Sequence, residues 1–78
     1  MTATYHFTVV LEPEETGGFT VRVPKLPEVV TCGDTEEEAL RMAEDAIRLA
    51  IEHRRDNNEP VPEEAQIQVR EVTVLLPA

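Results

Sequence analysis

Two histidines, one cysteine and sixteen acidic residues are the side chains through which this 78-residue chain could perform chemistry. General acid–base catalysis by His6 or His53 would need a positioned proton donor or nucleophile nearby, and the neighbouring sequence supplies none. We therefore interpret His6 as a surface histidine and His53 as a residue near a helix end. Cys32, which precedes Gly33, is either a reactive thiol or a small core side chain at the end of a strand.

The sequence contains no paired-cysteine motif, no HExxH metal motif and no glycine-rich phosphate loop. A metal site would need carboxylates that converge from separate elements, and no spacing here requires that. We therefore expect no catalytic residue, no metal and no cofactor. A hydrolase or degenerate nuclease that uses paired acids stays open as an alternative, because the separation of carboxylates cannot be read from sequence.

The acidic residues outnumber the seven basic ones and give a formal net charge of −9. Such a surface repels a phosphate backbone, so we expect no direct binding of DNA or RNA by this chain. A basic protein is a better electrostatic match, although the charge also fits a simple role in solubility. Our candidates for contact with a basic partner are exposed carboxylates of the first hairpin and of the helix, namely Glu12, Glu14, Glu15, Glu44, Asp45 and Glu52.

Length and composition predict one domain over residues 1–78. With a single cysteine the chain has no internal disulfide, which fits a reducing compartment. The start of the sequence lacks the pattern of a signal peptide. The apolar stretches are far shorter than the roughly 20 residues of a membrane span, so we expect a cytoplasmic protein that does not enter a membrane.

Alternating apolar residues predict three strands in the first half of the chain. Residues 5–12 alternate with the period of a half-buried strand, and residues 19–23 do so again. Gly17 and Gly18 between them supply the backbone angles that a hairpin needs. Pro24 and Pro27 predict a loop or an interrupted edge, and residues 29–32 form the third predicted strand.

A helix is predicted after Gly33-Asp34. Thr35 and Glu38 have the spacing of a capping box, and residues 36–38 place negative charge at the positive end of the helix dipole. From residue 39 to residue 51, apolar residues rich in alanine recur at spacings of three and four, which predicts a stripe that packs on the strands. Asn57-Asn58 and Pro60 predict the end of the helix.

A last strand is predicted over residues 66–76, and both of its faces are apolar at the far end. Val72, Val74 and Leu76 share the face opposite to Thr73 and Leu75. One helix on one side of a sheet cannot cover both faces. Either a bulge near residues 70–71 shifts the register, or the end of the strand projects into a second subunit. We expect a homo-oligomer, a dimer or a tetramer, with those three residues at its interface.

The predicted order is therefore β-β-β-α-β, an α+β fold with a small, mostly antiparallel sheet and one helix packed on one face. The three strands form a meander. The helix is then a right-handed crossover that returns the last strand to a position beside the first. Both outer strands are open edges, which proteins usually protect or pair.

The segment PKLPEVVTCGDTEEEAL, together with the opening YHFTVVLEPEETGGFTVRVP, resembles the HicB-like antitoxin family. The resemblance extends over nearly the whole chain and includes the proline-containing return after the helix. Lys25 stands where the family usually has an acidic residue, and Glu28-Val29 stand where it often has Gly-Cys. The positions that match the family pattern are Pro24, Leu26, Pro27, Thr31, Gly33, Asp34, Thr35, Glu38, Ala39 and Leu40.

The resemblance implies a partial RNase H-like fold without its catalytic acids. It also implies a role as an antitoxin that caps a small, basic HicA-type toxin, which cleaves mRNA with a histidine. Many members of the family continue into a DNA-binding segment. Since this sequence ends at Ala78, we expect no transcriptional repression by this chain alone. The alternative is an orphan structural or regulatory oligomer of the same fold, without a toxin.

Overall fold

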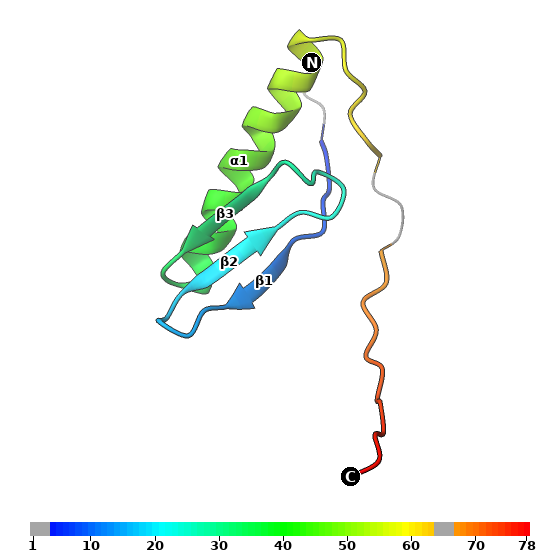
Figure 1. Cartoon of the computed structure of the whole chain (residues 1–78). Coiled ribbons are helices and arrows are strands. Elements are labelled where there is room, and N and C mark those ends of the chain that lie inside the picture. Colours follow the sequence, from blue (N-terminus) through cyan, green and yellow to red (C-terminus); the bar gives the residue numbers. More distant parts are fainter. Residues whose placement is uncertain (1–3, 64–66) are drawn as a thin grey trace.

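The computed structural model describes residues 4–63 and 67–78. These residues contain three strands, β1 (Val10–Pro13), β2 (Phe19–Arg22) and β3 (Val30–Gly33), followed by one helix, α1 (Glu36–Asp56) (Figure 1). The strands form an antiparallel sheet in the order β1-β2-β3. The predicted α+β class, a small antiparallel sheet with a single helix, is confirmed.

The turn between β1 and β2 is closed by two backbone hydrogen bonds. The amide of Gly17 donates to the carbonyl of Glu14 at 3.0 Å, and the amide of Glu14 donates to the carbonyl of Gly18 at 3.0 Å. The φ angles of Gly17 and Gly18 are 98° and 82°, a region that glycine adopts without strain. The predicted hairpin is confirmed, and its register places Leu11 opposite Val21.

The first strand begins later than the alternating pattern predicts. The sequence predicts a strand from residue 5, whereas β1 begins at Val10. Val10 pairs with Arg22, so a longer ladder would set Thr8 against Pro24, whose nitrogen has no proton to donate. Residues 5–9 therefore lead into β1 without joining its regular ladder, although Phe7 and Val9 still pack on the core.

The helix begins and ends where local sequence signals place it. The hydroxyl of Thr35 accepts a hydrogen bond from the amide of Glu38 at 3.1 Å, as an N-cap should. Asn57 is the C-cap, and Asn58 has a φ of 55°. Two ion pairs at a spacing of four residues also form on α1, Glu37 with Arg41 at 3.8 Å and Glu44 with Arg48 at 3.1 Å.

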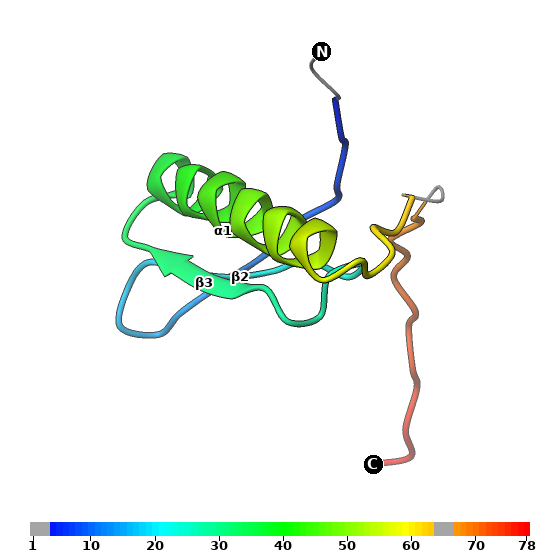
Figure 2. The ribbon, with the colours of Figure 1, turned by 90° about the horizontal axis from the view of Figure 1, so that it is seen from above.

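The core lies between the sheet and one side of α1, which covers mainly β2 and β3 (Figure 2). Small residues allow a close approach here. A Cβ atom added to Gly33 would lie 2.4 Å from the backbone nitrogen of Ala39, so the start of α1 rests directly on the end of β3. The buried apolar residues are Val21, Val23, Leu26, Val29, Ala39, Ala43 and Ile51.

The loop between β2 and β3 is compact. The amide of Leu26 donates to the carbonyl of Val23 at 3.0 Å, and the amide of Val29 donates to the carbonyl of Leu26 at 2.8 Å. Leu26 is fully buried and packs with Val23 and Val29 beneath the second half of α1. The two prolines of this segment therefore end β2 and allow one large side chain to fill the core below the helix.

The predicted last strand is not formed within the described residues. Residue 66 lies outside them, and residues 67–76, expected beside the first strand, run as extended chain away from the sheet (Figures 1 and 2). The alternating pattern is present, but a strand needs a neighbouring edge, and this segment does not contact one in the single copy. We refer to residues 67–78 as the tail.

Candidate partner-binding surface

The structure separates the six candidate carboxylates into two groups. Glu12, Glu14 and Glu15 lie on β1 and the hairpin turn that follows it. Glu12 forms an ion pair with Arg22 across the exposed face of the sheet at 2.9 Å. Glu14 accepts a hydrogen bond from the Thr20 hydroxyl. Two of these three carboxylates therefore have intramolecular partners, and all three are exposed.

The second group lies on α1. Glu44 and Asp45 both bind the guanidinium group of Arg48, at 3.1 and 3.3 Å, so part of their charge is already balanced. Glu52 is exposed one turn beyond Arg48, on the side of the helix that faces Thr4 and Tyr5. Arg48 therefore partly balances Glu44 and Asp45, as Arg22 balances Glu12 in the first group.

The structure also brings together carboxylates that lie far apart in the sequence. A Cβ atom added to Gly18 would lie 2.8 Å from the carbonyl oxygen of Gly33, so the hairpin turn abuts the turn between β3 and α1. Both turns lie at the same end of the molecule (Figures 1 and 2). We call the exposed carboxylates of this region the acidic end: Glu14, Glu15, Asp34, Glu36, Glu37 and Glu38.

The acidic end concentrates the net charge of the chain. It holds six of the sixteen acidic residues, and Arg41, at 3.8 Å from Glu37, is the basic residue that forms an ion pair with it among the described residues. The dipole of α1 offsets part of the negative charge of the first turn, because the helix begins there. The turns at residues 17–18 and 33–34 are adjacent only in the folded register, which is why the sequence did not reveal this convergence.

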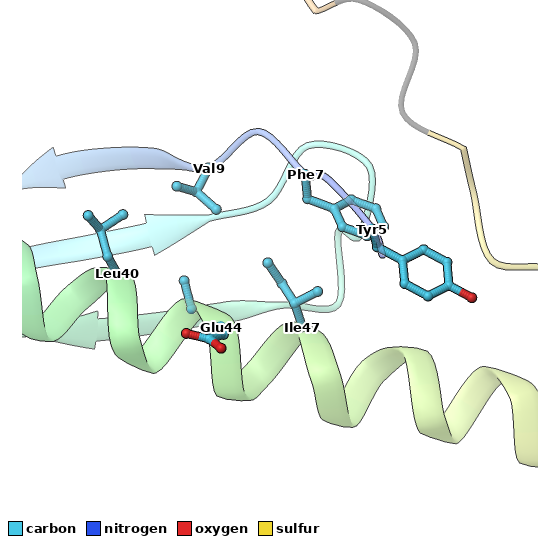
Figure 3. A pocket seen from close by; sticks show the side chains of 7 residues that line it. Tyr5, Phe7, Val9, Leu40, Glu44 and Ile47 are labelled. Carbon is cyan, nitrogen blue, oxygen red and sulfur yellow. The ribbon is translucent and has the colours of Figure 1, made fainter. Parts of the chain in front are cut away.

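A groove runs between α1 and the segment that leads into β1 (Figure 3). Its volume is about 290 Å³. Tyr5 and Phe7 stack with a ring-centroid distance of 6.5 Å, and Glu44 adds a carboxylate at the helix side. The groove is otherwise apolar, and the side chains that line it are Tyr5, Phe7, Val9, Leu40, Ala43, Glu44 and Ile47.

The residues considered for catalysis do not converge. His6 lies on the segment before β1, and His53 lies in the last turn of α1, where its carbonyl accepts a hydrogen bond from the Asn57 side chain at 2.8 Å. Cys32 is exposed on the open face of the sheet, so the interpretation as a core side chain is wrong. Its neighbours in the strand explain this, since Thr31 and Gly33 take the inward positions. Residues 4–63 and 67–78 contain no cluster of three histidine, cysteine or acidic side chains arranged to hold a metal ion.

The three residues predicted at an oligomer interface lie on the tail. Val72, Val74 and Leu76 are 80%, 70% and 83% exposed. The tail that carries them runs away from the sheet and α1 in the single copy (Figure 1). No helix in the described part of the chain is both long and apolar enough to cross a membrane.

Comparison with known proteins places these features in a family. The chain is similar to Antitoxin HicB 1 of Photorhabdus laumondii, with 50% identity over 56 residues that cover 72% of this chain and 36% of that protein. It is 36% identical to Antitoxin HicB of Escherichia coli K12 over 56 residues, which cover 72% of this chain and 41% of that protein. A UPF0150 protein of Thermoplasma acidophilum is 38% identical over 68 residues, which cover 87% of this chain and 94% of that protein.

The chain thus spans well under half the length of the antitoxins just named and nearly the whole length of the Thermoplasma protein. The family that matches is described as the HicB_like antitoxin of bacterial toxin-antitoxin system, and the match covers residues 4–78. It includes the sheet, the helix and the tail. The chain therefore belongs to the HicB-like antitoxin family of bacterial toxin-antitoxin systems.

Proposed function

We propose that this chain is a non-enzymatic antitoxin that neutralises a small, basic, HicA-type mRNA-cleaving toxin by protein–protein contact. The acidic end is the observation that carries the proposal. It gathers exposed carboxylates from two turns into one surface, and family membership supplies the class of partner. We further propose that the protein acts in the cytoplasm, as a homo-oligomer.

A surface of this kind acts on a basic nuclease in two ways. It attracts the partner over a distance of about one Debye length, roughly 8 Å at physiological salt, which speeds association. Once bound, it occupies the positive surface that the toxin would otherwise offer to RNA phosphates. Neutralisation then needs no chemistry, only coverage of that surface.

Within the candidate residues, Glu15 lies in the acidic end, and Glu44 and Asp45 lie on α1. Glu15 forms no ion pair with any described residue, whereas Glu44 and Asp45 share Arg48. Replacing Glu15 and Glu36 by glutamine should therefore weaken toxin binding about tenfold. Part of this loss should vanish at high salt, because exposed charges are screened there.

The experiment is a binding titration of the purified chain with any small basic protein that a neighbouring gene encodes, together with a growth assay under co-expression of that protein. The matched control is Glu59→Gln with Glu63→Gln, which removes the same charge far from the acidic end. Equal binding by the two double variants would refute the acidic end as the contact surface. If no basic protein binds and growth is not rescued, the antitoxin proposal fails and the orphan oligomer takes its place.

A further inference from the structure

The tail carries more exposed apolar surface than any other part of the described chain. Five of its large apolar residues are 70–91% exposed, namely Val69, Val72, Val74, Leu75 and Leu76. Contiguous apolar surface of this kind on a soluble protein marks a contact with another molecule. The tail also has the alternating side-chain pattern of a strand, so a sheet edge is the surface that suits it.

Both faces of the tail need to be covered. Thr73 and Leu75 point to one face, while Val72, Val74 and Leu76 point to the other. One copy of the chain offers a single layer, α1, to cover one face of a strand added to its sheet. The second face would remain in water. In a dimer, each tail can pack between the two molecules, so that both of its faces are covered.

An edge that can receive a strand lies beside the groove. β1 is an outer strand of the sheet, and no other strand lies on its far side among the described residues. The segment that precedes it presents Tyr5, Phe7 and Val9 to the groove, opposite Leu40 and Ile47 of α1 (Figure 3). Alternate side chains of an added strand would enter this apolar groove, while its backbone groups pair with the edge.

The dimensions of the tail fit this edge. Residues 67–76 span about 33 Å as a strand, and residues 5–13 span about 30 Å.

The whole chain has a radius of gyration of 15.5 Å and a longest dimension of 58 Å. A compact chain of this length would have a radius of gyration of about 11.5 Å. The single copy is therefore too extended to be self-contained, and the tail accounts for the excess.

We propose that residues 67–76 of one copy add as a strand to the edge formed by residues 5–13 of a second copy, and that the exchange is reciprocal. The occupant of the groove is thus the tail of a second copy of this chain. The inference specifies the oligomer named above. It does not depend on the toxin, because neither the tail nor the edge belongs to the acidic end.

Light scattering of the full chain at micromolar concentration should give the mass of a dimer or of a larger even-numbered assembly. Val74→Asp should raise the dissociation constant about 100-fold or more, since it would bury an unpaired charge. The matched control is Leu49→Asp, which places the same charge on an apolar side chain of α1 that is 66% exposed. A monomeric parent chain, or dissociation by Leu49→Asp instead of Val74→Asp, would overturn the proposal.

Cysteine pairing distinguishes a second copy from the same copy. In a Cys32→Ser background, one chain carries His6→Cys or Val10→Cys, and the other carries Arg70→Cys or Val74→Cys. After refolding together under oxidising conditions, a covalent pair that contains one chain of each kind is expected. If a single chain with both substitutions instead forms an internal disulfide and remains a monomer, the tail folds onto its own edge and the proposal is wrong. An intact dimer that fails to bind toxin would refute the proposed function alone.

Discussion

The guanidinium group of Arg54 binds both carboxylate oxygens of Glu28, with N–O distances of 2.8 Å for each bond. The pair joins the last turn of α1 to the loop between β2 and β3. Arg54 also donates to the carbonyl oxygen of Pro60 at 3.1 Å. The hydrogen bonds from Arg54 lower the pKa of Glu28 below its ordinary value, and the carboxylate raises the pKa of Arg54 in return. One side chain therefore fixes the far end of the helix to two other segments.

Breaking this pair should destabilise the fold by a small amount. In a double-mutant cycle with Arg54→Met and Glu28→Gln, we expect a coupling free energy of about 0.5–1 kcal/mol, because the pair is bidentate but still partly exposed. Urea unfolding followed by circular dichroism measures it. Arg54→Lys should recover only part of the coupling, since an ammonium group cannot form both bonds in the same geometry. A cycle of the exposed pair Glu37 and Arg41 is the control, with an expected coupling near zero.

The same pair should make stability depend on pH. The pKa of Glu28 is lower in the folded state than its ordinary value of 4.5. Its contribution is therefore fully present above about pH 4.5 and is lost as the pH falls through the lower pKa of the folded state. Glu28→Gln should flatten the decline of the urea midpoint between pH 5 and pH 3. An unchanged slope would show that Arg54 does not hold this carboxylate in solution.

Gly33 should tolerate no side chain. A Cβ atom at this position would meet three backbone atoms of Glu38 and Ala39 within 2.9 Å, and backbone cannot move aside as the end of a side chain can. We expect Gly33→Ala to lower the free energy of unfolding by about 3 kcal/mol. Gly17→Ala is the control, because it meets nothing within 4 Å and carries only the strain of a φ of +98°, about 1–2 kcal/mol. Equal losses would mean that α1 and β3 separate easily.

The N-cap should contribute measurably to the helix. Thr35→Ala removes the hydroxyl that accepts from the amide of Glu38, and we expect a loss of about 1 kcal/mol in unfolding free energy. Thr35→Ser keeps the oxygen and should restore most of it. Thermal unfolding of the three chains in parallel tests this order of stability.

Features decided by local chemistry were predictable from the sequence. The helix begins after Thr35 and ends at Asn57 because caps depend on a few neighbouring residues. The hairpin follows from Gly17 and Gly18 in the same way. The start of β1 was not predictable from its own alternation, because the ladder depends on what stands opposite, and Pro24 stands there.

Features that depend on distant contacts were missed. The acidic end exists because the register sets Phe19 opposite Gly33 and so brings two turns together. The bond from Arg54 to Glu28 joins residues 26 positions apart. The tail has the sequence pattern of a strand, but the pattern does not state which copy of the chain provides the edge.

The bond from Arg54 to the Pro60 carbonyl also determines how the chain leaves the helix. Pro60 and Pro62 fix φ within residues 57–63, and Arg54 holds the carbonyl of the first of them, so this part of the connection is stiff. In proteins that swap terminal segments, the hinge decides whether the segment returns to its own body or reaches a neighbour. Substitutions at residues 54, 60 or 62 would then alter assembly without touching either contact surface.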